Sequence, residues 1–260
     1  MNFQDISKEE MAKMEVKEGD RELEGEKSTM YRSLVARGNS LSQDRTDIQF
    51  AVKELSWDMS KPSERSWEGL KRLGRYLLGK ERYVVKFEYQ EWEGKLSVWT
   101  DTDYAGCLRT RKSTSGGLVR LGKHLVKSWS NTQSVIALSS GEAEYYGMVK
   151  GGSVGLGIKA LLADLGVKRG IKLKTDASAA KGIASRRGLG KVRHIEVSQL
   201  WLQEKVQKGD IEVVKIPGKI NKADALTKPV GGEKIAEHMG SVEGEVRRGR
   251  HALMPKITEG

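Results

Sequence analysis

Residues 96–101 read LSVWTD and residues 171–176 read IKLKTD. Both stretches contain alternating apolar side chains, and both finish in the pair Thr-Asp, as expected of a β-strand that ends in a carboxylate. Functional sites in α/β sheets are built where strands end. The two stretches therefore predict a sheet that presents Asp101 and Asp176 at its edge.

From residue 96 onward the apolar pattern predicts the element order β-β-β-α-β-α-α-β-α. The predicted strands are 96–101, 116–121, 124–129, 172–176 and 211–216, and the predicted helices are 139–165, 177–187, 195–208 and 222–227. Three consecutive strands followed by alternating helices and strands predict an α/β fold, with a five-stranded mixed sheet flanked by helices. The glycines of the first helix, at 147, 151, 152, 155 and 157, each cost about 1 kcal/mol relative to alanine, so we expect that helix to be weak or broken.

The segment before this sheet is predicted to be mostly helical. A helix over 47–57 begins at Asp47, and a second over 62–78 carries Trp67, Leu70, Leu73 and Leu77 on one face. A further strand is predicted over 83–89. The bases Lys71, Arg72 and Arg75 lie off the apolar face, which fits either a solvated surface or one that follows a nucleic-acid backbone.

Both ends of the chain are polar. Residues 1–30 hold nine acidic and five basic side chains with few large apolar residues, so we predict that they are disordered or loosely helical. Residues 231–260 include the run VRRGRH and are predicted to form a basic, poorly ordered tail. The remainder divides into a helical segment, 31–80, and a sheet domain, 83–230.

The whole chain of 260 residues carries 46 Lys and Arg against 35 Asp and Glu, a net charge of +11. This balance fits a polyanionic partner, although an ordinary basic protein has the same composition. A single cysteine, Cys107, excludes an internal disulfide and a cysteine-based zinc site. No apolar run approaches the ~18 residues of a membrane span, and residues 1–20 do not read as a secretory signal. We expect an intracellular protein, in a cytoplasmic particle or the nucleus, without a membrane partner.

Four acids stand at the ends of separate predicted elements: Asp101, Glu144, Asp176 and Asp224. Carboxylate oxygens are the ligands that Mg²⁺ prefers, and two such ions can promote phosphodiester cleavage. Any one strand-end aspartate more often caps a turn, so the pattern alone leaves both interpretations open. Glu142 lies three residues after Ser139 and is interpreted as a helix cap.

Many motifs in one order resemble the ribonuclease H (RNase H) domain of Copia-type (Ty1/copia) retrotransposon Pol polyproteins. They are WTDTDYAG at 99–106, RKSTSG at 111–116, SWS at 128–130, ALSSGEAEY at 137–145, TDASAA at 175–180, RHIE at 193–196, IP at 216–217 and KADALTKP at 222–229. Upstream, YRSLV at 31–35, DI at 47–48 and YL at 76–77 are similar to the end of the reverse transcriptase that precedes this domain.

The resemblance implies an RNase H-like fold and hydrolysis of the RNA strand of RNA–DNA hybrids. It places the family's catalytic, metal-binding acids on Asp101, Glu144, Asp176 and Asp224, with two Mg²⁺ ions, or Mn²⁺ in their place. Asp103 and His194 are predicted to contact the metal ligands without binding the metal themselves. A basic turn follows the first predicted strand of the sheet. It is predicted to contact nucleic acid through Arg109, Arg111, Lys112 and Ser113.

Two hypotheses of different classes remain at this stage. One is an active RNase H whose partners are the RNA–DNA hybrid and the reverse transcriptase portion of a polyprotein. The other is a folded but inactive nucleic-acid-binding relic of the same origin. No Tyr-x-Asp-Asp run occurs in the sequence, so the chain lacks the polymerase motif of a reverse transcriptase.

Overall fold

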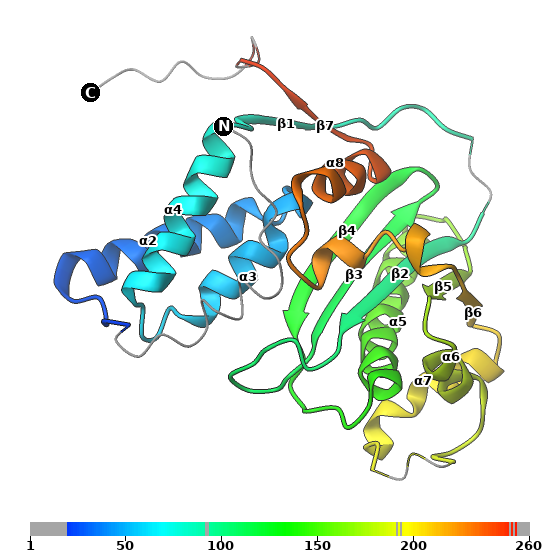
Figure 1. The fold of residues 1–260 in the computed structure, drawn as a ribbon. Coiled ribbons are helices and arrows are strands. Elements are labelled where there is room, and N and C mark those ends of the chain that lie inside the picture. The colour runs from blue at the N-terminus through cyan, green and yellow to red at the C-terminus, as the bar shows by residue number, and fades with distance from the viewer. Residues whose placement is uncertain are drawn as a thin grey trace.

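The structure, a computed structural model, describes residues 20–91, 94–190, 192, 194–249, 251 and 253. Its centre is a mixed sheet of five strands in the order β4-β3-β2-β5-β6 (Figure 1). Strands β2 (Leu96–Asp103), β3 (Thr114–Leu121) and β4 (His124–Thr132) are antiparallel neighbours, whereas β5 (Ile171–Thr175) and β6 (Ile211–Lys215) run parallel to β2. The predicted five-stranded mixed sheet and its element order are confirmed.

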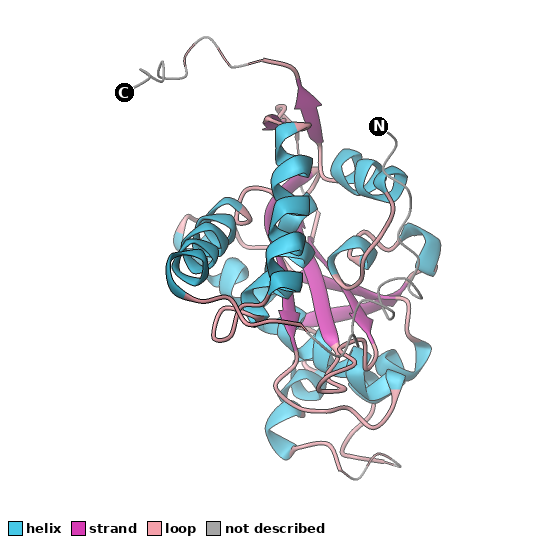
Figure 2. Ribbon diagram, turned by 60° about the vertical axis from the view of Figure 1, so that its left-hand side comes forward, coloured by secondary structure: helices cyan, strands magenta, loops and turns pink. Residues whose placement is uncertain are grey.

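The two faces of the sheet carry different cores, because side chains alternate along each strand. Val98 and Leu173 face helix α5 (Ser140–Asp164), next to α6 (Ser178–Ser185) and α7 (Trp201–Gln207). On the other face, Trp99 and Leu118 pack under Leu226 of the short helix η4 (Asp224–Leu226). The strands therefore lie between covering elements on both sides, as the turned view shows (Figure 2).

Helix α5 is continuous over 25 residues, so the expectation that its glycines would break it is wrong. Three of those glycines, at i, i+4 and i+8, form a stripe against β2. A Cβ at Gly147 would lie 2.5 Å from Thr102 Oγ1, one at Gly151 2.5 Å from Thr100 Cγ2, and one at Gly155 2.9 Å from Val98 Cγ2. The stripe lets the helix backbone approach the sheet closely, and this packing offsets the low helix propensity of glycine.

The segment before the sheet forms a helical unit with a core of its own. The unit consists of α2 (Gly25–Leu41), the short helix η1 (Thr46–Ile48), α3 (Gln49–Trp57) and α4 (Glu64–Leu78). Its core includes Tyr31, Val35, Val52 and Leu70, and the Tyr31 hydroxyl donates to the Leu55 carbonyl at 2.7 Å. The predicted helices over 47–57 and 62–78 thus form, although the Asp47 side chain pairs with Arg45 instead of capping α3.

The helical unit lies beside β4, the edge strand of the sheet (Figure 1). Lys53 of α3 donates to Thr114 Oγ1 of β3 at 2.9 Å, and Arg109 of the β2–β3 loop pairs with Asp58 at 2.8 Å. These polar contacts join the helical unit to the sheet near the end of β2 and the start of β3.

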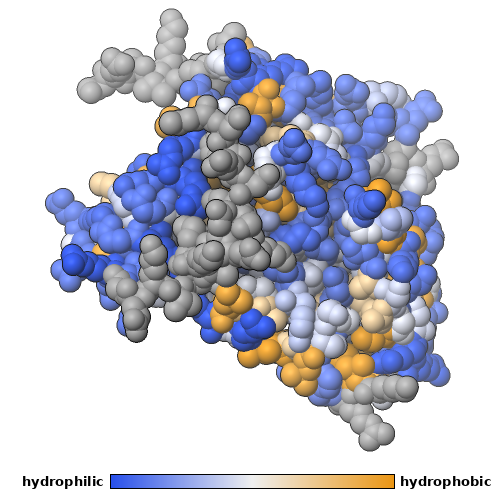
Figure 3. All heavy atoms as spheres, in the orientation of Figure 1, coloured by the Kyte–Doolittle hydropathy of each residue, from blue (hydrophilic) through white to orange (hydrophobic). Residues whose placement is uncertain are grey.

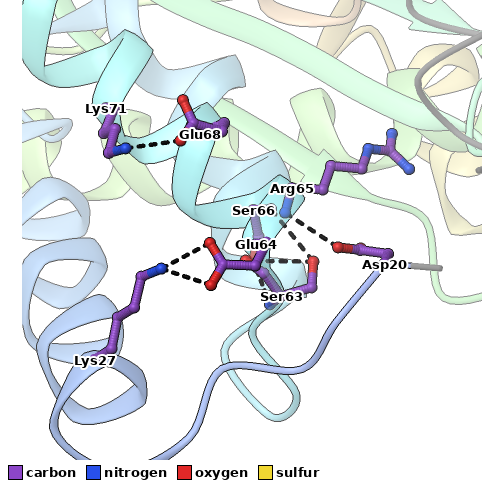
Figure 4. Close-up of polar contacts among 8 residues, drawn as sticks. All are labelled: Asp20, Lys27, Ser63, Glu64, Arg65, Ser66, Glu68 and Lys71. Atoms are coloured by element: carbon purple, nitrogen blue, oxygen red, sulfur yellow. Dashed lines mark hydrogen bonds and ion pairs between the residues drawn. The ribbon is translucent and has the colours of Figure 1, made fainter.

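The prediction of disorder over residues 1–30 is wrong for residues 20–30, while residues 1–19 lie outside the described part of the chain. Residues 20–24 run along the start of α4, where Leu23 N donates to Pro62 O at 2.7 Å and Arg65 N donates to Asp20 Oδ1 at 3.1 Å (Figure 4). Lys27 pairs with Glu64 at 2.6 Å, and Leu23 is buried in the helical core. The segment is ordered because α4 supplies partners that its own composition does not reveal.

The predicted poorly ordered tail from residue 231 is also wrong for its first part. Residues Gly232–Ser241 form α8, and β7 (Gly244–Arg247) pairs with β1 (Arg82–Val85), which is shorter than the predicted strand over 83–89. His238 of α8 is buried and contacts Thr46 Oγ1 of the helical unit at 3.0 Å. Tertiary contacts over a long sequence separation therefore order this segment.

The glycine stripe generates a paired test. Gly157 of α5 lies in open space, so Gly157→Ala should raise the free energy of unfolding by about 1 kcal/mol through helix propensity. Gly151→Ala gains the same propensity but forces a methyl group into Thr100, an overpacking that costs about 1–3 kcal/mol. Urea denaturation should therefore show opposite shifts. Stabilisation by both substitutions would contradict the close approach of α5 to β2.

Candidate active site

Three acids from three elements meet at one end of the sheet. Asp101 lies in β2, Glu144 in the second turn of α5, and Asp176 directly after β5. One carboxylate oxygen from each lies within 4.8 Å of the other two. The topology explains this meeting, because β2 and β5 are parallel neighbours and Trp99 pairs with Lys174, so Asp101 and Asp176 each lie two residues beyond a paired position.

Asp101 is buried, with 6% of its surface exposed, and its carboxylate is held from two sides. Thr227 Oγ1 donates to Oδ2 at 2.5 Å, and Asn221 Nδ2 lies 3.4 Å from Oδ1. The pKa of Asp101 is raised to about 6: burial is the main cause, the charges of Asp224 and Asp176 act in the same direction, and the Thr227 hydrogen bond opposes them. The orientation of this carboxylate is therefore set by the segment around η4.

Glu144 has the more perturbed carboxyl group. Its Oε1 accepts from the Thr102 backbone N–H at 3.3 Å, whereas its Oε2 is buried with no hydrogen-bond partner among the described residues. Burial, followed by the charges of Asp101 and Asp176, raises the pKa of Glu144 to about 9. A buried oxygen without a partner is rare in folded proteins and indicates a ligand that belongs there.

Asp224, the fourth predicted acid, is near the other three but is not one of the group. Its carboxylate pairs with Lys228, four residues later, and with Lys234 of α8 at 3.1 Å. Burial acts to raise the pKa of Asp224, but the hydrogen bonds and charges of the two lysines outweigh it, so the pKa is lowered overall. Asp224 is thus ionised and neutralised by lysines.

The three grouped acids fit a divalent cation. They offer hard carboxylate oxygens from rigid elements, one of which has no other partner. Mg²⁺ is commonly bound by a few carboxylates, with water and substrate phosphate completing its coordination. A cation would also relieve the repulsion that raises the pKa values of Asp101 and Glu144.

The two residues predicted to support the ligands lie in different places: Asp103 is on the strand of Asp101, and His194 contacts Glu142. Asp103 follows Asp101 by two residues on β2, opposite Thr114 of β3. His194 Nε2 lies 2.5 Å from Glu142 Oε2, and Glu142 also accepts from the Tyr146 hydroxyl at 2.8 Å and from Leu138 N at 2.9 Å. Glu142 is thus a buried anchor for the start of α5, two residues before Glu144.

The predicted nucleic-acid contacts divide into two groups. Arg109 and Arg111 are exposed on the β2–β3 loop, Arg109 in its ion pair with Asp58, and Lys112 is half-buried. Ser113 is fully buried, and its hydroxyl accepts from Ala105 N at 3.0 Å. The Ser113 side chain therefore closes the loop internally, and a contact of this residue with nucleic acid stays a prediction.

Sequence reasoning missed the residues that hold the acids in place. Asn221, Thr227 and Lys228 all lie in the segment 221–228, next to Asp224 in the sequence. The spacing of Asp224 and Lys228 at i and i+4 was a visible signal for their ion pair. Nothing in the sequence indicated that Thr227 and Asn221 would instead contact Asp101, which is more than 100 residues away.

No protein-family model matches the chain. Among curated proteins, it is 32% identical over 205 residues to the retrovirus-related Pol polyprotein from transposon RE1 of Arabidopsis thaliana, covering 78% of this chain and 14% of that protein. It is 31% identical over 193 residues to the corresponding polyprotein from transposon TNT 1-94 of Nicotiana tabacum, covering 74% of this chain and 14% of that protein.

The chain belongs to the Copia-type Pol polyprotein family. It spans about one seventh of the length of these relatives, 14% of each. Among solved structures, LC11-RNase H1 in complex with an RNA/DNA hybrid is 15% identical with a TM-score of 0.36, covering 51% of this chain and 94% of that one. The five-stranded mixed sheet expected from the sequence is the one observed. Within the described ranges, no helix is long and apolar enough to cross a membrane.

The raised pKa of Glu144 predicts how the stability of the protein without bound metal depends on pH. Folding raises the pKa of the Glu144 carboxyl group from 4.5 to about 9, so protonation of this group stabilises the folded state relative to the unfolded state. Its contribution to stability is fully present below pH 4.5 and is lost as the pH rises through about 9. Chemical denaturation in EDTA should therefore show stability falling with pH in this window, and Glu144→Gln should flatten the slope. Equal slopes in the two proteins would contradict the burial of an uncompensated carboxyl group.

Proposed function

We propose that this chain is a divalent-metal-dependent RNase H that cleaves the RNA strand of RNA–DNA hybrids. The single observation that carries the proposal is the convergence of Asp101, Glu144 and Asp176, whose oxygens lie within 4.8 Å of one another. The relationship to Copia-type Pol polyproteins and the RNase H-like sheet support the same reaction class. The basic charge of the chain suits a polyanionic substrate.

Asp101, Glu144 and Asp176 would hold the cation, with Mg²⁺ the expected ion and Mn²⁺ an alternative. Divalent ions at such a site lower the pKa of a water molecule and stabilise the charge of the leaving oxygen in phosphodiester hydrolysis. Thr227 and Asn221 fix the orientation of the Asp101 carboxylate before any ligand arrives. Glu144 must release its proton to act as a ligand, so ion binding should strengthen as the pH rises.

Asp224 would join the site only by leaving its lysine partners. Its ion pairs with Lys228 and Lys234 are partly exposed, and surface pairs contribute only about 0–1 kcal/mol each. A divalent cation nearby is a stronger attraction for a carboxylate than either pair. We infer that Asp224 is the adjustable member of the proposed site and that the other three acids form its rigid part.

The alternative is a folded but inactive nucleic-acid-binding relic. A relic has no need to keep one buried and two partly buried acids together at the cost of mutual repulsion, and their close approach favours the enzyme. Gly147, Gly151 and Gly155 of α5 do not indicate decay, because they allow its close packing on β2. Incubation of a labelled hybrid with the protein and Mg²⁺, beside an EDTA control, separates the two functions directly.

Metal binding should be visible without any activity. Because Mg²⁺ neutralises the three acids only in the folded state, millimolar Mg²⁺ should raise the melting temperature of the protein. Asp176→Asn removes one ligand and should abolish most of this shift, whereas Asp164→Asn, at the far end of α5, should leave it intact. A melting temperature that does not respond to Mg²⁺ or Mn²⁺ would argue against a metal site.

The substitution Asp101→Asn should reduce hybrid cleavage without weakening hybrid binding. The substitution keeps the volume and hydrogen-bonding capacity of the side chain but removes the charge that holds the cation, so hybrid cleavage should fall by orders of magnitude. Hybrid affinity should be unchanged or higher, since a charge that repels phosphate is gone. Cleavage rates and fluorescence anisotropy measure the two effects. An active parent whose rate is insensitive to Asp101→Asn would contradict the assigned site while leaving the fold intact.

A further inference from the structure

A polar groove lies where the helical unit meets the edge of the sheet, apart from the three acids. It has a volume of about 380 Å³. The helical unit contributes Gln43, Gln49 and Lys53 to its wall, β4 contributes Lys127 and Asn131, and α5 contributes Lys150. None of the residues that line it is an Asp or Glu. The groove is therefore cationic, and its remaining walls are rich in hydroxyl and amide groups.

The three lysines are not equivalent. Lys53 is mostly buried and is held by Thr114 Oγ1 and by the neighbouring Glu54. Lys127 and Lys150 are exposed, and neither ammonium group has an ion-pair or hydrogen-bond partner among the described residues. Two uncompensated ammonium groups, one from β4 and one from α5, beside a third that is fixed in place, form a site that suits an anion.

The groove walls also hold unsatisfied polar atoms. Gln49 is 7% exposed, and its Nε2 donates to Ser42 O at 2.9 Å, but its Oε1 is buried without a partner among the described residues. The hydroxyl groups of Ser128 and Ser130 are also buried without a hydrogen-bond partner among the described residues. Buried polar groups are almost always paired in folded proteins. These atoms leave the groove walls with hydrogen-bonding capacity that the described residues do not use.

The register of the sheet relates this groove to the acids. Asp101 is paired with Gly116, and Gly116 is paired with Ser130, so Ser130 of the groove lies two strands away at the same level. Neighbouring strands are about 4.8 Å apart, so the backbones of Asp101 and Ser130 are separated by roughly 10 Å. One strand of a duplex rises about 3.4 Å per nucleotide and covers this distance in about three nucleotides.

We propose that this groove binds the phosphate backbone of the nucleic-acid duplex, a few nucleotides from the point of cleavage. The proposal rests on the proposed function, since it concerns the same substrate. The proposal gives the helical unit a role in substrate binding, because this unit supplies one wall of the groove. Lys127 and Lys150 make the direct contacts, and Lys53 positions the wall.

The test compares two double variants of the full chain, each prepared with Asp101→Asn so that the hybrid stays intact. Lys127→Gln with Lys150→Gln removes the two free charges of the groove. Lys123→Gln with Lys168→Gln removes the same charge from the β3–β4 turn and from the loop before β5, both at the end of the sheet away from the acids. Anisotropy of a fluorescent RNA–DNA hybrid is measured in Mg²⁺ over a series of salt concentrations, after melting curves confirm that all proteins are folded.

The groove variant should bind more weakly, and its slope of log affinity against log salt should be shallower by roughly 2, about one unit per lost phosphate contact. The matched control should keep the slope of the parent. Equal slopes for the two double variants would overturn the groove as a binding site. A parent that binds no hybrid would instead overturn the proposed function, and the groove proposal with it.

Discussion

The close packing of α5 on β2 is the contact on which the rest of the structure depends. Gly147, Gly151 and Gly155 remove every Cβ that would hold the helix away from Thr102, Thr100 and Val98. The same approach brings Glu144, one turn before the stripe, to the end of β2 beside Asp101. A larger residue in the stripe would move the Glu144 carboxylate as well as the core. Fold and site are therefore set by one interface.

That interface has an electrostatic cost. It holds three carboxyl groups together in a partly buried place, which raises the pKa of Glu144 to about 9 and that of Asp101 to about 6. Folding of the metal-free chain must overcome this repulsion with the packing around it. Thr227 and Asn221 reduce the cost at Asp101 through hydrogen bonds, while Lys228 and Lys234 neutralise Asp224. The lysines offset part of the fourth negative charge, which still acts to raise the pKa of Asp101.

The helical unit and the C-terminal segment are parts of the same structure as the sheet. His238 of α8 contacts Thr46 of the helical unit, and β7 pairs with β1 directly after α4. Lys234 of the same α8 pairs with Asp224. The C-terminal segment thus connects the helical unit to the candidate site. The face of the molecule drawn in Figure 3 is largely hydrophilic.

The sequence by itself determined the strands, their order and the acids at their ends, because alternation of apolar residues and the Thr-Asp endings at Asp101 and Asp176 are local signals. It did not determine the fate of Asp224, the burial of Ser113 or the order of residues 20–30 and 231–249. The order of the terminal segments depends on partners distant in sequence, such as Pro62 for Leu23 and Thr46 for His238. Asp224 and Ser113 have partners within about ten residues, but only the folded loop brings these groups together. The glycines of α5 show the reason most clearly. Local propensity predicts a weak helix, and only the tertiary structure supplies the strand whose close packing makes glycine the residue that fits.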